Sequence, residues 1–366
     1  MEELRIPGPT PCPSEVLQVM TKQMINHRGP EFGQILNGVT AKLKQLFQTK
    51  GDVFVLTGSG TGGLEAAVVN TLSPGDKVLS VSIGVFGERF ASIAQQFGAE
   101  VISLRSEWGQ SADVDAVRQA LYAEPKIKAV MVTHNETSTG VTNDLAAIGS
   151  VVKEFDKLLL VDAISSLGSV NLPVDDWHCD VTVTGSQKGW MVPPGLTMIS
   201  LSQEAWQAYS KAKMPRFYWD FDKARSYLEK GQTPWTPAVS IVFALSVSLE
   251  MMLREGLANI IARHARVGKV ARDGVKSLGL SLFAEENHAS NTVTAVAASD
   301  GLDTKKLVKI LREEHQMVLA GGQQTLDGKI FRIGHLGWVT EDDIKTVISE
   351  LRMALPSAGF RSVSQL

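Results

Sequence analysis

Val181-Thr-Val-Thr-Gly-Ser-Gln-Lys188-Gly189 is the stretch of this 366-residue sequence that says most about its fold. Its β-branched residues, Val181 to Thr184, are typical of a short buried strand. The strand ends at Gly185, and a lone lysine follows beside small polar side chains. A lysine amine that is held in place and partly desolvated is suited to attack a carbonyl carbon.

A second apolar strand, Leu158 to Val161, ends in Asp162-Ala-Ile-Ser-Ser166. A strand-end aspartate can be a helix cap, and a strand-end lysine can be a solvated loop charge. Together, however, they are the pair that pyridoxal 5'-phosphate requires, because lysine binds its aldehyde and aspartate holds its pyridinium nitrogen. We therefore predict that Lys188 and Asp162 bind this cofactor.

A glycine-rich turn, Thr57-Gly-Ser-Gly-Thr-Gly-Gly63, follows another apolar strand and opens a helix. Glycines allow close approach of an anion, and a helix N-terminus offers free N–H groups. We predict a phosphate site at Ser59, Gly60 and Thr61, with Ser186 and Gln187 adding donors. An ordinary strand-to-helix turn is the alternative. The turn has neither the dinucleotide-binding spacing nor a Gly-Lys-Ser/Thr sequence.

Short apolar segments alternate with helical patterns from about residue 52 onward. Strands are expected at 53–56, 77–81, 100–104, 129–133, 158–161, 181–184 and 197–201, and helices at 14–25, 87–97 and 114–121. Most of these strands are apolar on both faces, as parallel strands between two helical layers are. The alternation predicts a doubly wound α/β domain. Ligands of such sheets bind at the carboxyl ends of the strands.

The pattern changes near residue 240. A helix-like stretch covers 240–278, and strands at 281–283, 292–297 and 329–333 alternate with helices at 304–315 and 340–355. This order is typical of an α+β unit. We therefore divide the chain into an N-terminal segment (1–20), a large domain (21–250) and a small C-terminal domain (251–366).

Composition favours an ordinary globular protein of the cytoplasm. The net charge of −3 gives no reason to expect nucleic acid or an anionic membrane as a partner. The two cysteines, Cys12 and Cys179, form neither a disulfide framework nor a metal site. We find no signal peptide and no apolar run long enough to span a membrane.

The sequence resembles the class V, fold type I, aminotransferases, and within them the alanine–glyoxylate and serine–pyruvate group. The resemblance covers nearly the whole chain. It is carried by the Pro7-Gly-Pro start, by Thr57-Gly-Ser-Gly-Thr and by Thr133-His-Asn-Glu-Thr-Ser-Thr-Gly140. It continues through Asp162-Ala-Ile-Ser-Ser and Gly185-Ser-Gln-Lys-Gly to Phe331-Arg-Ile-Gly-His335.

The resemblance implies a role for each matching residue. Lys188 would be the Schiff-base lysine and proton carrier, and Asp162 would keep the ring nitrogen protonated. Arg332 would bind the substrate carboxylate, although a surface arginine at a strand edge is the alternative. Gly8 would let the N-terminal segment lie against the substrate. Phe86 would stack on the cofactor ring, although a plain core residue is the alternative. Thr137 would lie near the 3' oxygen of the ring. Ile164 and Gln187 would be the remaining cofactor-binding residues.

A homodimer with shared active sites is also implied. Residues 1–20 would contribute to the site and the dimer, and Thr236 would reach the phosphate of the neighbouring subunit. Some relatives have a tyrosine where this chain has Thr233. His27 and Arg28 would lie near the substrate entry, where a basic pair could meet a second carboxylate, although a structural loop is equally compatible.

Two rival functions share parts of this sequence pattern. A cysteine desulfurase needs a reactive cysteine after the lysine, and none follows Cys179; it also has a histidine where this chain has Gln187. A non-catalytic subunit associated with a soluble hydrogenase is the other rival, and intact Lys188, Asp162 and Arg332 argue against it. Two cysteines are too few for the thiolate clusters of a hydrogenase itself.

The expected activity is transamination from alanine or serine to a 2-oxo acid, with glyoxylate as the best acceptor. Aspartate and ureidoglycine remain alternative donors, because one methylene or hydroxyl changes discrimination by only about 1–3 kcal/mol. A dicarboxylate donor would need a second cation, for which Arg28 is the first candidate.

Overall fold

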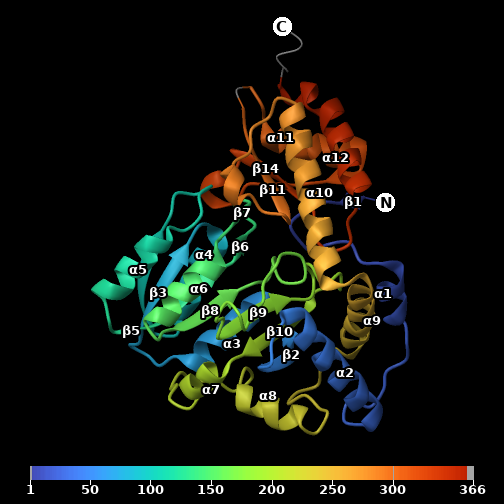
Figure 1. Cartoon of the computed structure of the whole chain (residues 1–366). Helices are drawn as coiled ribbons and strands as arrows, with labels where there is room; N and C mark the ends of the chain where they lie inside the picture. Colours follow the sequence, from blue (N-terminus) through green and yellow to red (C-terminus); the bar gives the residue numbers. More distant parts are fainter. Residues whose placement is uncertain (1, 300, 361–366) are drawn as a thin grey trace.

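The computed structural model describes residues 2–299 and 301–360. Its centre is a seven-stranded sheet in the order β2-β10-β9-β8-β5-β3-β4 (Figure 1). Only β10 is antiparallel to its neighbours, so the mostly parallel sheet expected from the sequence is confirmed. The strands are β2 (Asp52–Gly58), β3 (Lys77–Ser82), β4 (Glu100–Arg105), β5 (Ile127–Thr133), β8 (Leu158–Asp162), β9 (Val181–Gly185) and β10 (Gly195–Leu201).

Helices cover both faces of this sheet because its strands carry apolar side chains on both sides. In β5, Ala129 and Met131 pack into one apolar cluster, while Val130 and Val132 pack into the other. Helices α3, α4, α7 and α8 contribute to the first cluster, and α1, α2, α5, α6 and α9 to the second. The helices are α1 (Ser14–Val19), α2 (Pro30–Phe47), α3 (Gly60–Thr71), α4 (Val85–Gln96), α5 (Val114–Ala123), α6 (Leu145–Glu154), α7 (Gln203–Tyr209), α8 (Phe221–Leu228) and α9 (Val239–Glu255).

Side-chain caps fix where many helices begin. The cap residues are Ser59, Asp113, Asp144, Ser202, Asp220, Asp303 and Thr340, each accepting a backbone N–H of the first turn. Such caps satisfy donors that have no partner inside the helix. Helix α1 ends at Val19, so the helix expected at 14–25 is too long.

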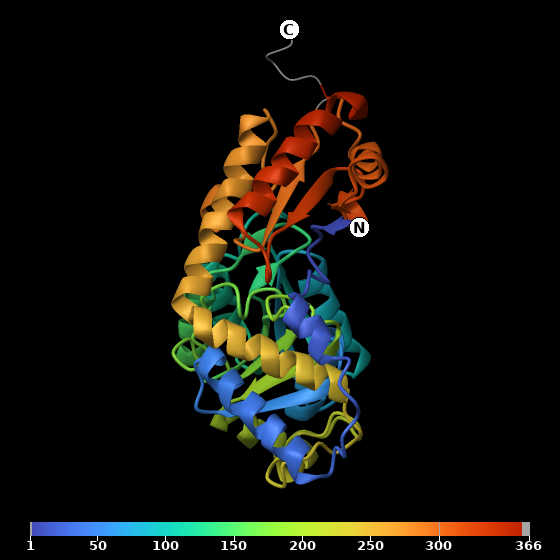
Figure 2. The same ribbon diagram turned by 90° about the vertical axis from the view of Figure 1, so that its right-hand side faces the viewer.

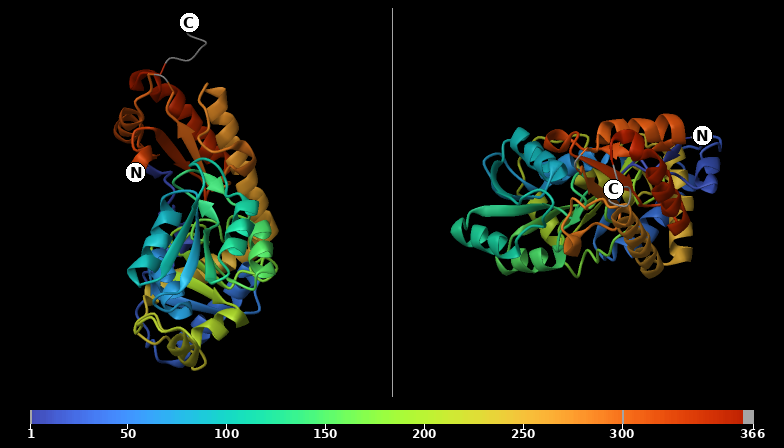
Figure 3. Two further views of the ribbon diagram at one scale, coloured as in Figure 1. Left: turned by 90° about the vertical axis from the view of Figure 1, so that its left-hand side faces the viewer. Right: turned by 90° about the horizontal axis from the view of Figure 1, so that it is seen from above.

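A smaller sheet, in the order β11-β14-β13, lies at the end of the molecule that carries the C-terminus (Figure 3). A separate apolar cluster, built from residues 267–360, fills the space between this sheet and its helices. The elements are α10 (Leu257–Ser277), β11 (Val293–Ala297), α11 (Thr304–His315), β12 (Met317–Val318), β13 (Ala320–Gly321), β14 (Ile330–Gly334) and α12 (Glu341–Ala354).

The long helix expected at 240–278 is wrong, since α9 and α10 meet at an angle (Figure 2). The break falls at Gly256, whose φ of +85° is available to glycine at little cost. The strand expected at 281–283 is reduced to an isolated bridge between Leu282 and Val296. The expected division at residue 250 falls inside α9 and stays a prediction.

The N-terminal segment returns to the C-terminal elements. Strand β1 (Glu3–Leu4) pairs in parallel with β12, which places the N-terminus beside the small sheet (Figures 1 and 2). A two-stranded ribbon, β6 (Asn135–Glu136) and β7 (Val141–Thr142), follows β5. Within the described residues, no helix has the length and apolar character needed to cross a bilayer.

Candidate active site

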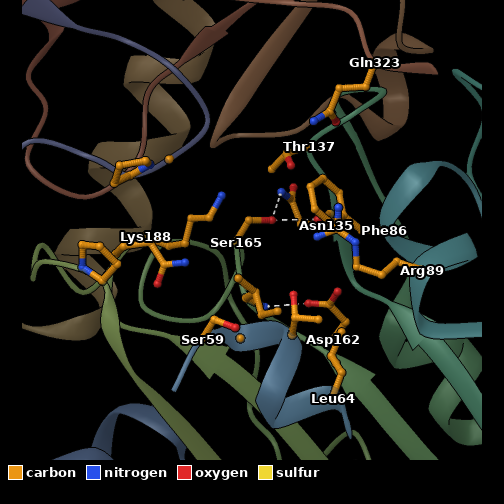
Figure 4. Close-up of a pocket in the computed structure, with 17 residues that line it drawn as sticks. Ser59, Leu64, Phe86, Arg89, Asn135, Thr137, Asp162, Ser165, Lys188 and Gln323 are labelled. Carbon is orange, nitrogen blue, oxygen red and sulfur yellow. Dashed lines mark hydrogen bonds between the residues drawn. The ribbon is translucent and has the colours of Figure 1, made fainter. Parts of the chain in front are cut away.

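A cavity of about 320 Å³ opens at the carboxyl ends of the parallel strands (Figure 4). Three distant parts of the chain line it: the N-terminal segment, the loops that follow the strands of the large sheet, and Gln323 from the small-sheet region. Ten of the residues predicted from the sequence line this cavity: Gly8, Ser59, Gly60, Thr61, Phe86, Thr137, Asp162, Ile164, Gln187 and Lys188. Thr236 and Arg332 are not among the lining residues.

Lys188 lies just beyond the end of β9, with its amine in the cavity. Burial lowers the pKa of this amine to about 8, and the charges of Arg332 and Arg89 act in the same direction. The Nζ atom donates to the backbone oxygen of Pro7. A Cβ atom at Gly8 would lie 2.6 Å from the Lys188 Nζ, so a larger residue would displace the lysine side chain, and the φ of +130° also favours glycine.

Asp162 is the last residue of β8, and its side chain is 3% exposed. Burial raises the pKa of its carboxyl group from 3.8 to about 7, because the charged form is poorly solvated. One oxygen accepts the backbone N–H of Ile164 at 3.0 Å. A positively charged partner in the cavity would therefore favour the ionised carboxylate.

The turn that begins α3 has the form of an anion site. Ser59 caps the helix, and the N–H groups of Gly60 and Thr61 have no backbone acceptor in the part of the chain that the structure describes. A Cβ at Gly60 would lie 2.5 Å from the Ile164 side chain, so the turn packs directly on the segment after β8.

Ser186 does not take part in this site, contrary to the sequence-based expectation. Its hydroxyl donates to the Pro193 oxygen at 2.8 Å and accepts the Leu196 N–H, which fixes it in the turn before β10. Gln187 does line the cavity, and its buried Oε1 has no hydrogen-bond partner among the described residues. A buried amide oxygen without a partner is costly, and a ligand donor would remove that cost.

Glu136 organises the wall that carries Phe86, a role that the sequence did not reveal. It is fully buried, and its carboxylate accepts the N–H groups of Phe86, Gly87 and Ser138 as well as the Ser138 hydroxyl, at 2.6–3.2 Å. These bonds tie the loop containing Thr137 to the first turn of α4. Burial raises the pKa of Glu136.

Arg332 lies in β14, 5% exposed, directly behind the cavity wall. Its Nε donates to the Gly321 oxygen at 2.9 Å, and its Nη1 donates to the Thr137 oxygen at 2.9 Å and more weakly to the Gln323 Oε1. Burial lowers the pKa of the guanidinium to about 10. Among the described residues, none accepts a hydrogen bond from Nη2, so this nitrogen is free to donate to a ligand carboxylate.

Arg28 does not line the cavity of its own chain. Its guanidinium donates to Gln232 Oε1 and to the backbone oxygens of Thr233 and Pro234 at 3.0–3.1 Å, and lies over the Tyr227 ring. Arg28 thus holds a loop within its own chain, and its place near the substrate entry of a dimer stays a prediction. Thr233 uses its hydroxyl within the same loop, donating to the Trp235 oxygen at 2.7 Å.

Seven residues that the sequence analysis did not assign also line the cavity: Pro9, Leu64, Arg89, Asn135, Ser165, Pro194 and Gln323. Asn135 and Ser165 both lie in motifs that the sequence singled out, and the Asn135 Nδ2 donates to the Ser165 hydroxyl at 2.8 Å. The arginine at position 89 stands three residues after Phe86, on the same helix.

The residues present fit pyridoxal phosphate. A helix N-terminus with free N–H groups suits a phosphate, a buried carboxylate suits a ring N–H, and a desolvated amine suits an aldehyde. Gln187 and Gly8 both line the same cavity. No cluster of metal-ligating side chains occurs in residues 2–299 and 301–360.

The family model "Aminotransferase class-V" matches residues 4–344. The chain belongs to the class-V aminotransferases. Among curated members of this family, it is 47% identical to the soluble hydrogenase 42 kDa subunit of Anabaena cylindrica, over 97% of this chain and 94% of that protein. It is 38% identical to the L-aspartate–glyoxylate aminotransferase of Paracoccus denitrificans, over 97% and 91% of the two chains.

Solved structures of aminotransferases show the same fold. The alanine–glyoxylate aminotransferase of Nostoc sp. superimposes with a TM-score of 0.93 at 30% identity, covering 97% of this chain and 95% of that one. The predicted resemblance to class V, fold type I aminotransferases is thereby confirmed.

Proposed function

We propose that this aminotransferase moves the amino group of a small L-amino acid, alanine or serine, to glyoxylate or a related 2-oxo acid, with pyridoxal 5'-phosphate as cofactor. The observation that carries the proposal is the convergence of Lys188, Asp162 and the Ser59–Thr61 turn on one cavity, with Arg332 directly behind its wall. The volume of about 320 Å³ suits a cofactor with a small substrate.

When bound, pyridoxal phosphate supplies an aldehyde that takes up the amino group and a ring that stabilises negative charge at the substrate Cα. Lys188 would take the Cα proton and return it to the C4' position. With a pKa of about 8, its amine is partly neutral near neutral pH and can accept a proton. Asp162, as a carboxylate, would hold the proton on the ring nitrogen.

The remaining residues would bind and orient. Arg332 would hold the α-carboxylate through its free edge, since a planar guanidinium suits a carboxylate. Phe86 would stack on the ring, and Thr137 would bond near its 3' oxygen. Ile164 would contact the ring beside Asp162, and Gln187 would donate to the phosphate. Gly8 would keep the N-terminal segment close to the substrate without obstructing the Lys188 amine.

We also propose a homodimer with shared active sites. Thr236 is exposed and outside the cavity of its own chain, which agrees with a role toward the phosphate of a neighbouring subunit. A cytoplasmic location stays a prediction from the composition.

A non-catalytic, hydrogenase-associated subunit is the alternative, and it is favoured by the name of the Anabaena cylindrica relative, soluble hydrogenase 42 kDa subunit. Aspartate or ureidoglycine as donor is a second alternative. A scaffold has no need for a lysine amine whose pKa is lowered to about 8 inside a cavity. This geometry supports catalysis.

The test is an absorbance spectrum of the purified protein, followed by titration with L-alanine, L-serine and L-aspartate. We expect a visible band from the bound cofactor that disappears with a donor and returns with glyoxylate. Lys188→Ala serves as the matched control and should show no such cycle. Absence of the band after incubation with pyridoxal phosphate would reject the proposed aminotransferase activity and favour the non-catalytic, hydrogenase-associated subunit.

A further inference from the structure

Arg89 is a cation of the active-site cavity that the proposed reaction does not use. It projects from helix α4 into the space beside Phe86 and Asn135 (Figure 4). Its guanidinium carbon lies 4.8 Å from the centroid of the Phe86 ring. A cation over an aromatic face is held in a preferred orientation while the edges of its guanidinium stay open.

The guanidinium of Arg89 has no acidic partner within the described part of the chain. The adjacent acid, Glu88, is already engaged by Arg105, which reaches its two carboxylate oxygens at 2.8 and 3.0 Å. Glu136 lies on the other side of the helix start, but its carboxylate accepts four hydrogen bonds from the chain itself. The charge of Arg89 is therefore available to a ligand.

The charge of Arg89 is felt in the cavity. It lowers the pKa of the Lys188 amine and also lowers the pKa of the Asp162 carboxyl group. The lining residues contribute two cations, Lys188 and Arg89, against the single carboxylate of Asp162. Arg332, behind the wall, adds a third positive charge that the proposed function assigns to the α-carboxylate of the substrate.

Arg28 does not line the cavity of its own chain, and its guanidinium makes three hydrogen bonds to the 232–234 loop. Among the described arginines, Arg89 is the one that lines the cavity, and it combines this place with an exposed side chain and open donor edges. A guanidinium with an open edge can bind a carboxylate through two parallel hydrogen bonds.

We propose that Arg89 binds a second acidic group of the substrate, so that this site accepts a dicarboxylic amino donor of the aspartate type as well as a small neutral one. This inference rests on the proposed transamination and adds a specificity residue to it. The α-carboxylate lies on Arg332, and the side-chain carboxylate reaches across the cavity to Arg89.

The experiment compares kcat/KM for L-aspartate and L-alanine, with glyoxylate in excess, in the holoenzyme and its variants. Arg89→Gln should lower the value for aspartate by roughly 10- to 100-fold more than that for alanine, because only aspartate loses a charge-assisted contact. Arg89→Lys, which keeps the charge but not the fork, should give an intermediate loss. Arg118→Gln removes an arginine of α5 that pairs with Glu154, away from both Glu88 and the cavity, and should change neither value.

Equal losses for both donors, with weaker retention of the cofactor, would assign Arg89 to the cofactor and overturn the proposal. Unchanged aspartate kinetics in Arg89→Gln would overturn it as well. If the wild type transfers no amino group from any amino acid, the proposed function fails. Binding of maleate, an unreactive dicarboxylate, then still tests whether Arg89 binds a second carboxylate. Thermal stabilisation of the cofactor-loaded protein by maleate and not by acetate, lost in Arg89→Gln, would support the site; no stabilisation would reject it.

Discussion

Replacing Asp162 by Asn should stabilise the cofactor-free protein, and increasingly so as the pH rises. Burial raises the pKa of this carboxyl group from 3.8 to about 7. The folded protein therefore retains a proton that the unfolded chain releases above about pH 4, so this group lowers the free energy of unfolding as pH rises to 7. One pH unit corresponds to about 1.4 kcal/mol, which makes the full penalty roughly 4 kcal/mol above pH 7.

Asparagine has no charge to desolvate, and its oxygen can still accept the Ile164 N–H. The advantage of Asp162→Asn should grow by roughly 2 kcal/mol between pH 5.5 and 8, and then level off. Urea unfolding followed by the fluorescence of the seven tryptophans measures it. The variant should at the same time lose transamination, because its amide cannot hold the ring proton.

Asp180→Asn is the matched control for this stability measurement. Asp180 is also buried, but its two oxygens accept the Leu159 N–H at 2.8 Å and the Ser202 hydroxyl at 2.6 Å. An amide has only one oxygen, so Asp180→Asn loses one of these two bonds. It should therefore be stabilised less than Asp162→Asn, although burial raises the pKa of Asp180 as well. A stability difference between Asp162→Asn and the wild type that does not change with pH would refute the reasoning about the Asp162 charge.

Three other outcomes are expected. The rate at which cofactor-free protein takes up pyridoxal phosphate should rise with pH and level off above about pH 8, because burial lowers the pKa of Lys188 to about 8 and only the neutral amine attacks the aldehyde; a rate still rising steeply at pH 10 would contradict it. Arg332→Lys should raise KM for every carboxylate substrate by roughly tenfold, with a smaller effect on kcat, since lysine lacks both the Nη2 donor and the bonds to Gly321 and Thr137 that orient it; initial-rate kinetics measure this, and an unchanged KM would remove Arg332 from the substrate site. Gly8→Ala should reduce cofactor uptake while the far-ultraviolet circular dichroism stays unchanged, because its Cβ would lie 2.6 Å from the Lys188 Nζ and the φ of Gly8 is +130°; normal uptake would show that the N-terminal segment can move away.

The large sheet could be predicted from the sequence because its strands are apolar on both faces, which leaves little choice of partner. The carboxyl ends of those strands then place Asp162 and Lys188 at one edge, however the helices pack. The break at Gly256 was harder to predict. A single glycine in a helical pattern is tolerated in many helices, and only its φ of +85° shows that this one ends α9.

The rest of the site depends on contacts between distant segments, to which local sequence patterns are blind. Glu136 stands inside a quoted motif, yet its function follows from its distance to the backbone of Phe86, fifty residues away. Arg28 and Arg89 look equally basic in the sequence. Packing gives them different positions. The guanidinium of Arg28 donates to the 232–234 loop, whereas Arg89 lines the cavity.

The N-terminal segment shows why the catalytic lysine depends on the whole chain. Thr10 binds the backbone of the lysine turn, through its N–H to the Gln187 oxygen at 3.1 Å and through its hydroxyl to the Lys188 oxygen at 3.0 Å. At the other end of the segment, the Arg5 oxygen accepts the N–H of Gly334 in β14, the strand that carries Arg332. The turn that holds Lys188 and the strand that holds Arg332 are thus connected through residues 5–10. A displacement of the small sheet relative to the large one would be transmitted along this segment to the Lys188 amine.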